Sequence, residues 1–92
     1  MCRNIRVLHN FQPPTTPEEI RDAALQFVRK VSGTRKPPHA DEAVFTRAVD
    51  DIAAATEKLL GSLHAHGAIR TREGEREKAR ARWQKRETSF SR

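Results

Sequence analysis

The sequence predicts an all-α protein: an antiparallel helical hairpin, with an irregular N-terminal segment packed on it and a charged C-terminal arm that is partly helical or disordered. Two stretches repeat apolar residues every three or four positions, as amphipathic helices do. Proline pairs interrupt the chain before and between them, and a basic stretch with few apolar residues follows. The 92 residues suit one small domain, so we expect a hairpin domain over residues 1–67 and a basic arm over residues 68–92.

The start of the chain predicts a lead-in without regular structure. Apolar and polar residues alternate only weakly there, and Pro13-Pro14 then excludes a helix. We expect Ile5, Leu8 and Phe11 to lie against the core of the hairpin.

A first helix is predicted from about residue 17 to residue 32. Thr16 and Glu19 can form a capping box, in which each satisfies a free amide of the other, and Pro17 suits the first helical position. Gly33 permits the left-handed backbone that ends many helices. The predicted apolar face consists of Ile20, Ala24, Phe27 and Val31, and Ala23 and Val28 widen it.

A second helix is predicted from about residue 41 to residue 65, with Asp41 as its cap and Gly67 as its stop. Its apolar residues form a seam with heptad-like spacing, which favours packing against another helix. The seam consists of Phe45, Val49, Ile52, Thr56, Leu59 and Leu63. Two helices cover only one side of each apolar face. A homodimer or a protein partner at the C-terminal part of this seam and the adjacent Leu60 is therefore one functional hypothesis.

Most of the net charge lies in the arm. Residues 1–69 hold nine Lys/Arg and eight Asp/Glu, a net charge of +1, whereas residues 70–92 hold nine and four, a net charge of +5. From Arg72 to Glu87 the sequence is polar on every side of a helix. We therefore expect the arm to be a fraying exposed helix or a disordered segment without stable tertiary packing.

The composition of the arm indicates binding to phosphate groups. Lysine and arginine release counterions from a nucleic-acid backbone, and an indole can stack on an unpaired base. The candidate contacts are Arg76, Lys78, Arg80, Arg82, Trp83, Lys85 and Arg86. Our first functional hypothesis is a non-enzymatic binding module that presents this arm to RNA, DNA or the ribosome. A charged tail that only keeps the protein in solution is the competing interpretation.

A second group of cations falls near the joint between the two predicted helices and in the lead-in. If the lead-in packs back on the hairpin, these side chains can hold a phosphate or a carboxylate. The alternative is a solvated helix end whose cations complement the helix dipole. The group consists of Arg3, Arg6, Arg29, Lys30, Arg35 and Lys36.

Several short segments carry a resemblance to a known family. The opening Met-Cys-Arg-Asn-Ile, followed by Glu18-Glu19-Ile20-Arg21 and Ala24 to Lys30, resembles a bacterial family catalogued as domain of unknown function 2277. Further matching positions are Leu8, Asn10-Phe11, Pro13-Pro14, Ser32-Gly33 and Lys36-Pro37. The resemblance covers about residues 1–63, and it implies no activity, substrate or cofactor.

The lone cysteine, Cys2, is the one candidate for catalysis. Neighbouring arginines favour a thiolate, so a thiol-dependent activity is the third hypothesis, and a purely structural thiol is its alternative. His64 and His66 diverge on a helix and have no partners at metal-ligand spacing, so we expect no metal site. No catalytic dyad, triad or nucleotide-binding loop is present, which argues against an enzyme and against a cofactor.

Features of the sequence also bear on the compartment. A single thiol is typical of a reducing compartment, and the opening residues lack the apolar run of a secretory signal. The longest apolar run, Ile52 to Ala55, is far shorter than the roughly 20 residues that span a bilayer. We therefore expect a cytoplasmic protein without a membrane partner.

Overall fold

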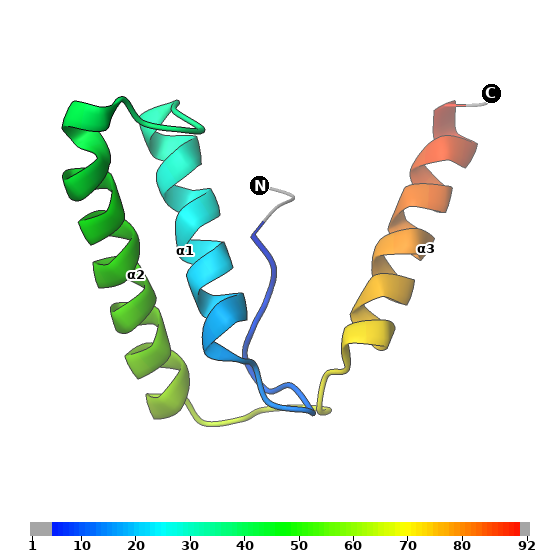
Figure 1. The fold of residues 1–92 in the computed structure, drawn as a ribbon. Coiled ribbons are helices and arrows are strands. Elements are labelled where there is room, and N and C mark those ends of the chain that lie inside the picture. Colours follow the sequence, from blue (N-terminus) through cyan, green and yellow to red (C-terminus); the bar gives the residue numbers. More distant parts are fainter. Residues whose placement is uncertain (1–4, 91–92) are drawn as a thin grey trace.

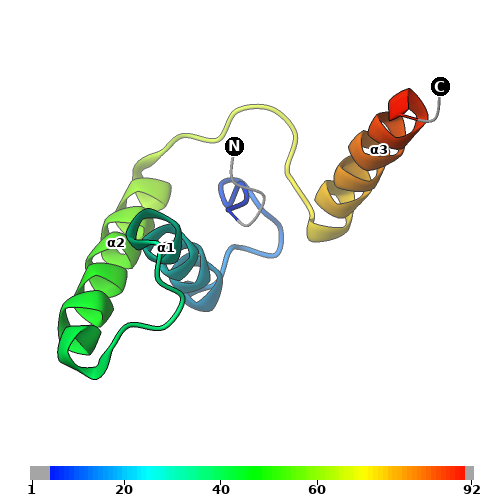
Figure 2. The ribbon, with the colours of Figure 1, turned by 90° about the horizontal axis from the view of Figure 1, so that it is seen from above.

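The computed structural model describes the backbone of residues 5–90 and the side chains of residues 5–86. Three α-helices follow one another: α1 (Pro17–Ser32), α2 (Glu42–Ser62) and α3 (Arg72–Phe90). Figures 1 and 2 show α1 and α2 packed side by side as an antiparallel hairpin, while α3 stands apart from both. The described part of the chain contains no strand, so the predicted all-α hairpin is confirmed.

Helix α1 begins and ends where its local signals place it. The Thr16 hydroxyl accepts a hydrogen bond from the Glu19 amide at 3.2 Å, and the Glu19 carboxylate accepts one from the Thr16 amide at 2.9 Å. Gly33 ends the helix with a φ of 69°, a conformation that glycine adopts without strain. The prediction of a helix over residues 17–32 is confirmed.

Helix α2 is shorter than predicted at its C-terminus. A short 3-10 turn (His39–Asp41) precedes it, and the Asp41 side chain does not form the expected cap. The helix ends at Ser62, three residues before the predicted end, with Leu63 already extended. All residues from 61 to 69 are exposed, so little burial of apolar side chains would stabilise a further turn.

The core of the hairpin is thin. Its buried residues are Ile20, Ala24, Val28 and Val49. The predicted face of α1 is confirmed for Ile20, Ala24 and its edge residue Val28, whereas Phe27 and Val31 are 43% and 66% exposed. The reason is that α2 packs beside α1 at the edge that carries Ala24 and Val28, with Val49 between them. The other edge of the apolar face remains in solvent.

Candidate nucleic-acid interface

An arginine at the start of α3 fastens this helix to the beginning of α1. The Arg72 guanidinium donates to both carboxylate oxygens of Glu19, at 2.9 and 2.6 Å. It also donates to the carbonyls of Pro13 and Pro14 at 2.9 and 3.2 Å, and lies 5.5 Å from the ring centre of Phe11. This bidentate pairing of a guanidinium with a carboxylate fixes the relative orientation of the two side chains as well as the distance between them. The first turn of the arm is thus packed on the lead-in, contrary to the prediction of an arm without tertiary contacts.

The segment before α3 is tied to the lead-in as well. The Arg70 amide donates to the Asn10 carbonyl at 2.8 Å, and the Gln12 amide donates to the Arg70 carbonyl at 2.9 Å. The Arg70 side chain reaches the His9 carbonyl at 2.9 Å, and the Asn10 amide group reaches the Ala68 carbonyl at 3.2 Å. These bonds cross the predicted boundary between residues 67 and 68. The division into a hairpin domain and an arm stays a prediction.

The bond between Glu19 and Arg72 predicts how stability depends on pH. The hydrogen bonds from Arg72, and then that from the Thr16 amide, lower the pKa of Glu19 from 4.5 to about 2. A lowered pKa in the folded state stabilises the fold above pH 4.5, and this contribution is lost as the pH falls towards 2. We expect the free energy of unfolding in urea to fall less for Glu19→Gln than for the wild type when the pH is lowered from 4.5 to about 2. An equal fall in both proteins would contradict the stabilising role of the Glu19 carboxylate.

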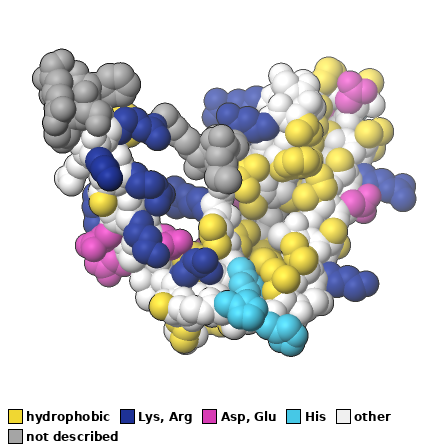
Figure 3. Space-filling view, turned by 180° about the vertical axis from the view of Figure 1, so that it is seen from behind, with side chains coloured by type: hydrophobic (Ala, Val, Ile, Leu, Met, Phe, Trp, Pro, Cys, Tyr) yellow, Lys and Arg dark blue, Asp and Glu magenta, His cyan; other side chains and the backbone are white. Residues whose placement is uncertain are grey.

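The candidate cations of α3 lie in solvent. Residues 76–86 are exposed throughout, and Lys78, Arg82 and Lys85 share one face because they are four and three residues apart. Among the described side chains, Lys78 forms an ion pair with Glu75 at 3.2 Å and Arg80 forms one with Glu77 at 3.4 Å, both within this helix. Figure 3 shows lysine and arginine side chains along α3, many of them towards the hairpin. The candidate base-stacking residue Trp83 is half exposed on this helix.

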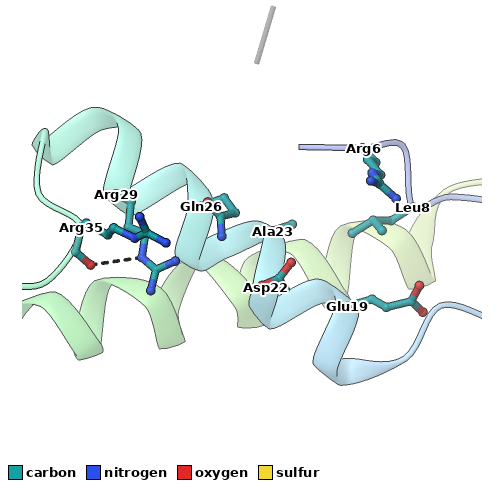
Figure 4. Close-up of a pocket in the computed structure, with 8 residues that line it drawn as sticks. All are labelled: Arg6, Leu8, Glu19, Asp22, Ala23, Gln26, Arg29 and Arg35. Carbon is teal, nitrogen blue, oxygen red and sulfur yellow. Dashed lines mark hydrogen bonds between the residues drawn. The ribbon is translucent and has the colours of Figure 1, made fainter. Parts of the chain in front are cut away.

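The second predicted group of cations is only partly brought together. Arg6, Arg29 and Arg35 line an open hollow of about 730 Å³ on the side of α1 that faces away from α2. Figure 4 shows Arg29 and Arg35 close together at one end of this hollow and Arg6 at the other. The Arg29 Nε donates to the Arg35 backbone carbonyl at 3.1 Å, which ties the Arg29 side chain to the backbone of the joint. The remaining cations of the hairpin joint, Lys30 and Lys36, are exposed and do not line the hollow.

The hollow extends along α1 from Glu19, near the base of α3, to Arg29 and Arg35 at the joint of the hairpin. Its lining includes Glu19, Asp22 and Gln26, which are three and four residues apart and so share one face of α1 with Arg29. Since Glu19 is bonded to Arg72 of α3, this face of α1 is turned towards α3. Cations of α3 and of the hollow therefore face a common gap.

Other candidate sites receive less support. Cys2 and Arg3 lie outside the described residues, so the thiol hypothesis stays a prediction. Among residues that the structure describes, no three side chains of histidine, cysteine, aspartate or glutamate lie close enough to hold a metal ion. No helix in the same part of the chain has both the length and the apolar character to cross a membrane.

Comparison with known proteins gives one match. Residues 1–78 match the model of a family described as uncharacterized conserved protein, DUF2277. No curated protein and no solved structure matches. The matched region reaches past the predicted residue 63 and includes Arg70 and Arg72, so the fastening of α3 lies within it.

Proposed function

The chain belongs to the DUF2277 family of uncharacterised conserved proteins, and we propose that it is a non-enzymatic module that binds the phosphate backbone of RNA or DNA, ribosomal RNA included. The observation that carries the proposal is the placement of α3. This 19-residue helix extends about 28 Å into solvent, with cations along its length and tertiary hydrogen bonds at its base.

The cations of α3 are available for phosphate. Among the side chains that the structure describes, Arg76, Arg82 and Arg86 have no carboxylate at ion-pair distance. The ion pairs of Lys78 and Arg80 are exposed and within one helix, so each contributes only about 0.2–0.5 kcal/mol and exchanges readily for a phosphate. Phosphate contacts of this kind position a protein on a nucleic acid without reading its sequence.

The fastening at Arg72 favours a binding arm over a tail that only keeps the protein in solution. A solubilising tail needs no fixed direction, whereas Arg72 makes four hydrogen bonds that fix the first turn of α3. A binding surface that is ordered in advance loses less conformational entropy when the partner arrives.

The hollow on α1 offers a second set of cationic contacts for the same nucleic acid. Arg29 and Arg35 lie next to each other without a described carboxylate partner, and two like charges at close range favour a bound anion. A guanidinium group also matches phosphate in a bidentate way. A nucleic acid in the gap would therefore touch α3 on one side and the arginines of the hollow on the other.

A salt titration tests the proposal. We expect the full chain to bind labelled single-stranded RNA, duplex RNA and duplex DNA in fluorescence anisotropy, with little preference for sequence. Four to six phosphate contacts give a log–log slope against salt of about −3 to −5, so affinity should fall about 60- to 1,000-fold from roughly 50 to 200 mM KCl. The absence of binding to all three probes at the lower salt concentration, or binding that salt does not weaken, would refute the proposal.

A further inference from the structure

One face of the hairpin is apolar and only partly covered: its Ala48 and Ile52 pack against the core, whereas its Ala55 and Leu59 are exposed. On α2, Ala48, Ile52, Ala55 and Leu59 are four, three and four residues apart, so they form one stripe, and Leu63 extends it beyond the helix. The exposed Phe27 and Val31 of α1 border the same side. Leu59 is 54% exposed. Figure 3 shows hydrophobic side chains gathered over the hairpin.

The opposite face of the hairpin is closed by polar contacts. Arg21 of α1 and Asp50 of α2 form an ion pair across it. Given 3.6 residues per turn, Asp50 lies about 140–180° around α2 from the apolar stripe, and Arg21 lies about 80–120° around α1 from Phe27 and Val31. The two faces of the hairpin therefore differ in character, and only one of them is suited to packing against another apolar surface.

The chain exposes more surface than a folded monomer of its size. Its accessible area is 7757 Å², whereas the usual scaling for a mass of 10.5 kDa gives about 5,400 Å². Its radius of gyration is 16.2 Å, against about 12 Å for a compact chain of this length. The polar helix α3 accounts for part of this excess. The uncovered apolar side chains, however, belong mainly to the hairpin.

A hairpin with so small a core needs additional burial. Four buried residues supply little of the apolar burial that stabilises a fold, and small domains usually add disulfides, metals or subunits. An internal disulfide is excluded, because Cys2 is the only cysteine. The narrowest dimension of the molecule is 16 Å, about one layer of helices, whereas stable domains pack two layers around a core.

We propose that the apolar face binds the same face of a second copy of this chain, so that two hairpins form a four-helix bundle. From Val44 to Leu59 the face is about 22 Å long and two helices wide. The excess area of roughly 2,300 Å² per chain exceeds the roughly 800 Å² that each partner buries in a standard interface.

Charge favours a second copy as the occupant. Residues 1–69 have a net charge of only +1, and the α2 positions of the face carry no charged residue, so two hairpins do not repel each other. A two-fold symmetric interface pairs a surface with itself, and an apolar face without charged residues can do so without opposing like charges. The basic helix α3 stands apart from the hairpin in Figure 2, and Phe27, Val31 and Leu59 of the apolar face are exposed.

Molar mass and thermal stability at several concentrations test this proposal. We expect the wild type to show twice its 10.5 kDa in light scattering, and a melting temperature that rises with concentration from about 10 µM to 1 mM. Leu59→Glu should give a monomer that melts at a lower temperature. The matched control Ala54→Glu should remain dimeric, because Ala54 is an exposed residue of α2 about 140° around the helix from Leu59.

Two results would overturn the proposal. One is a wild type that stays monomeric over the whole range with a constant melting temperature, which would leave the face to a different protein. The other is a Leu59→Glu variant that dimerises as well as Ala54→Glu. If Leu59→Glu does not fold, the concentration series of the wild type decides on its own.

Discussion

Reversing two arginines of α3 should weaken nucleic-acid binding about 100-fold at low salt. The double variant Arg82→Glu/Arg86→Glu removes two exposed cations and places two carboxylates near the phosphates. Each lost phosphate contact lowers the slope of log affinity against log salt by about one unit, so we expect a drop of about two. Fluorescence anisotropy at several salt concentrations measures both quantities on the full chain.

A matched charge reversal on the hairpin tests whether binding depends on the cations of α3 or only on the net charge of the protein. Arg47→Glu/Lys58→Glu changes the net charge by the same amount on exposed positions of α2, away from the gap that α3 faces. It should weaken binding several-fold at most, through the long-range field. Should both double variants lose affinity equally, binding would depend on net charge alone, and the assignment to α3 would be wrong.

The tertiary bonds at the base of α3 explain why charge reversal is preferable to deletion. Removing residues 70–92 would also remove Arg70 and Arg72, together with the backbone bonds to Asn10 and Gln12. Glu19 would then lose the bonds that most strongly lower its pKa. A deletion would therefore change the stability of the hairpin along with the binding surface. Substitutions beyond the first turn of α3 leave this fastening intact.

The sequence predicts those parts of the fold whose signals are local. Thr16, Pro17 and Gly33 lie within or next to the helix they delimit, and α1 has the predicted bounds. The C-terminus of α2 has no such signal before Gly67, and there the prediction is three residues too long. The choice between Phe27 and Val28 as core residue depends on where α2 packs, which the spacing of α1 alone does not determine.

The candidate site is predictable in composition but not in geometry. The cations of α3 stand out by charge, and they are exposed as expected. Arg72 has the same local surroundings as the other arginines of the arm, yet it binds Glu19, 53 residues away in sequence. Whether Arg6 joins Arg29 and Arg35, while Lys30 and Lys36 stay apart, depends on the path of the lead-in. Contacts of this range follow from tertiary packing, not from spacing.

The thin core makes one substitution decisive for folding. Val49 is 2% exposed and packs between Ala24 and Val28 at the centre of the hairpin. Val49→Asp would bury a carboxylate among apolar atoms with no hydrogen-bond donor, which costs several kcal/mol. Because small domains are stable by only about 5–15 kcal/mol in total, and this core is small even for its class, we expect the variant to lose the circular dichroism of α1 and α2 at 25 °C.

A control on the same helix separates burial from helix propensity. Thr46→Asp replaces another β-branched residue of α2, three positions from Val49, but on the exposed side. It should fold with a melting temperature near that of the wild type, because the new carboxylate stays in water. A Val49→Asp variant as helical and as stable as Thr46→Asp would mean that the hairpin does not depend on the contact between α1 and α2. The position of α1, to which Arg72 binds α3, would then not be fixed by its packing on α2.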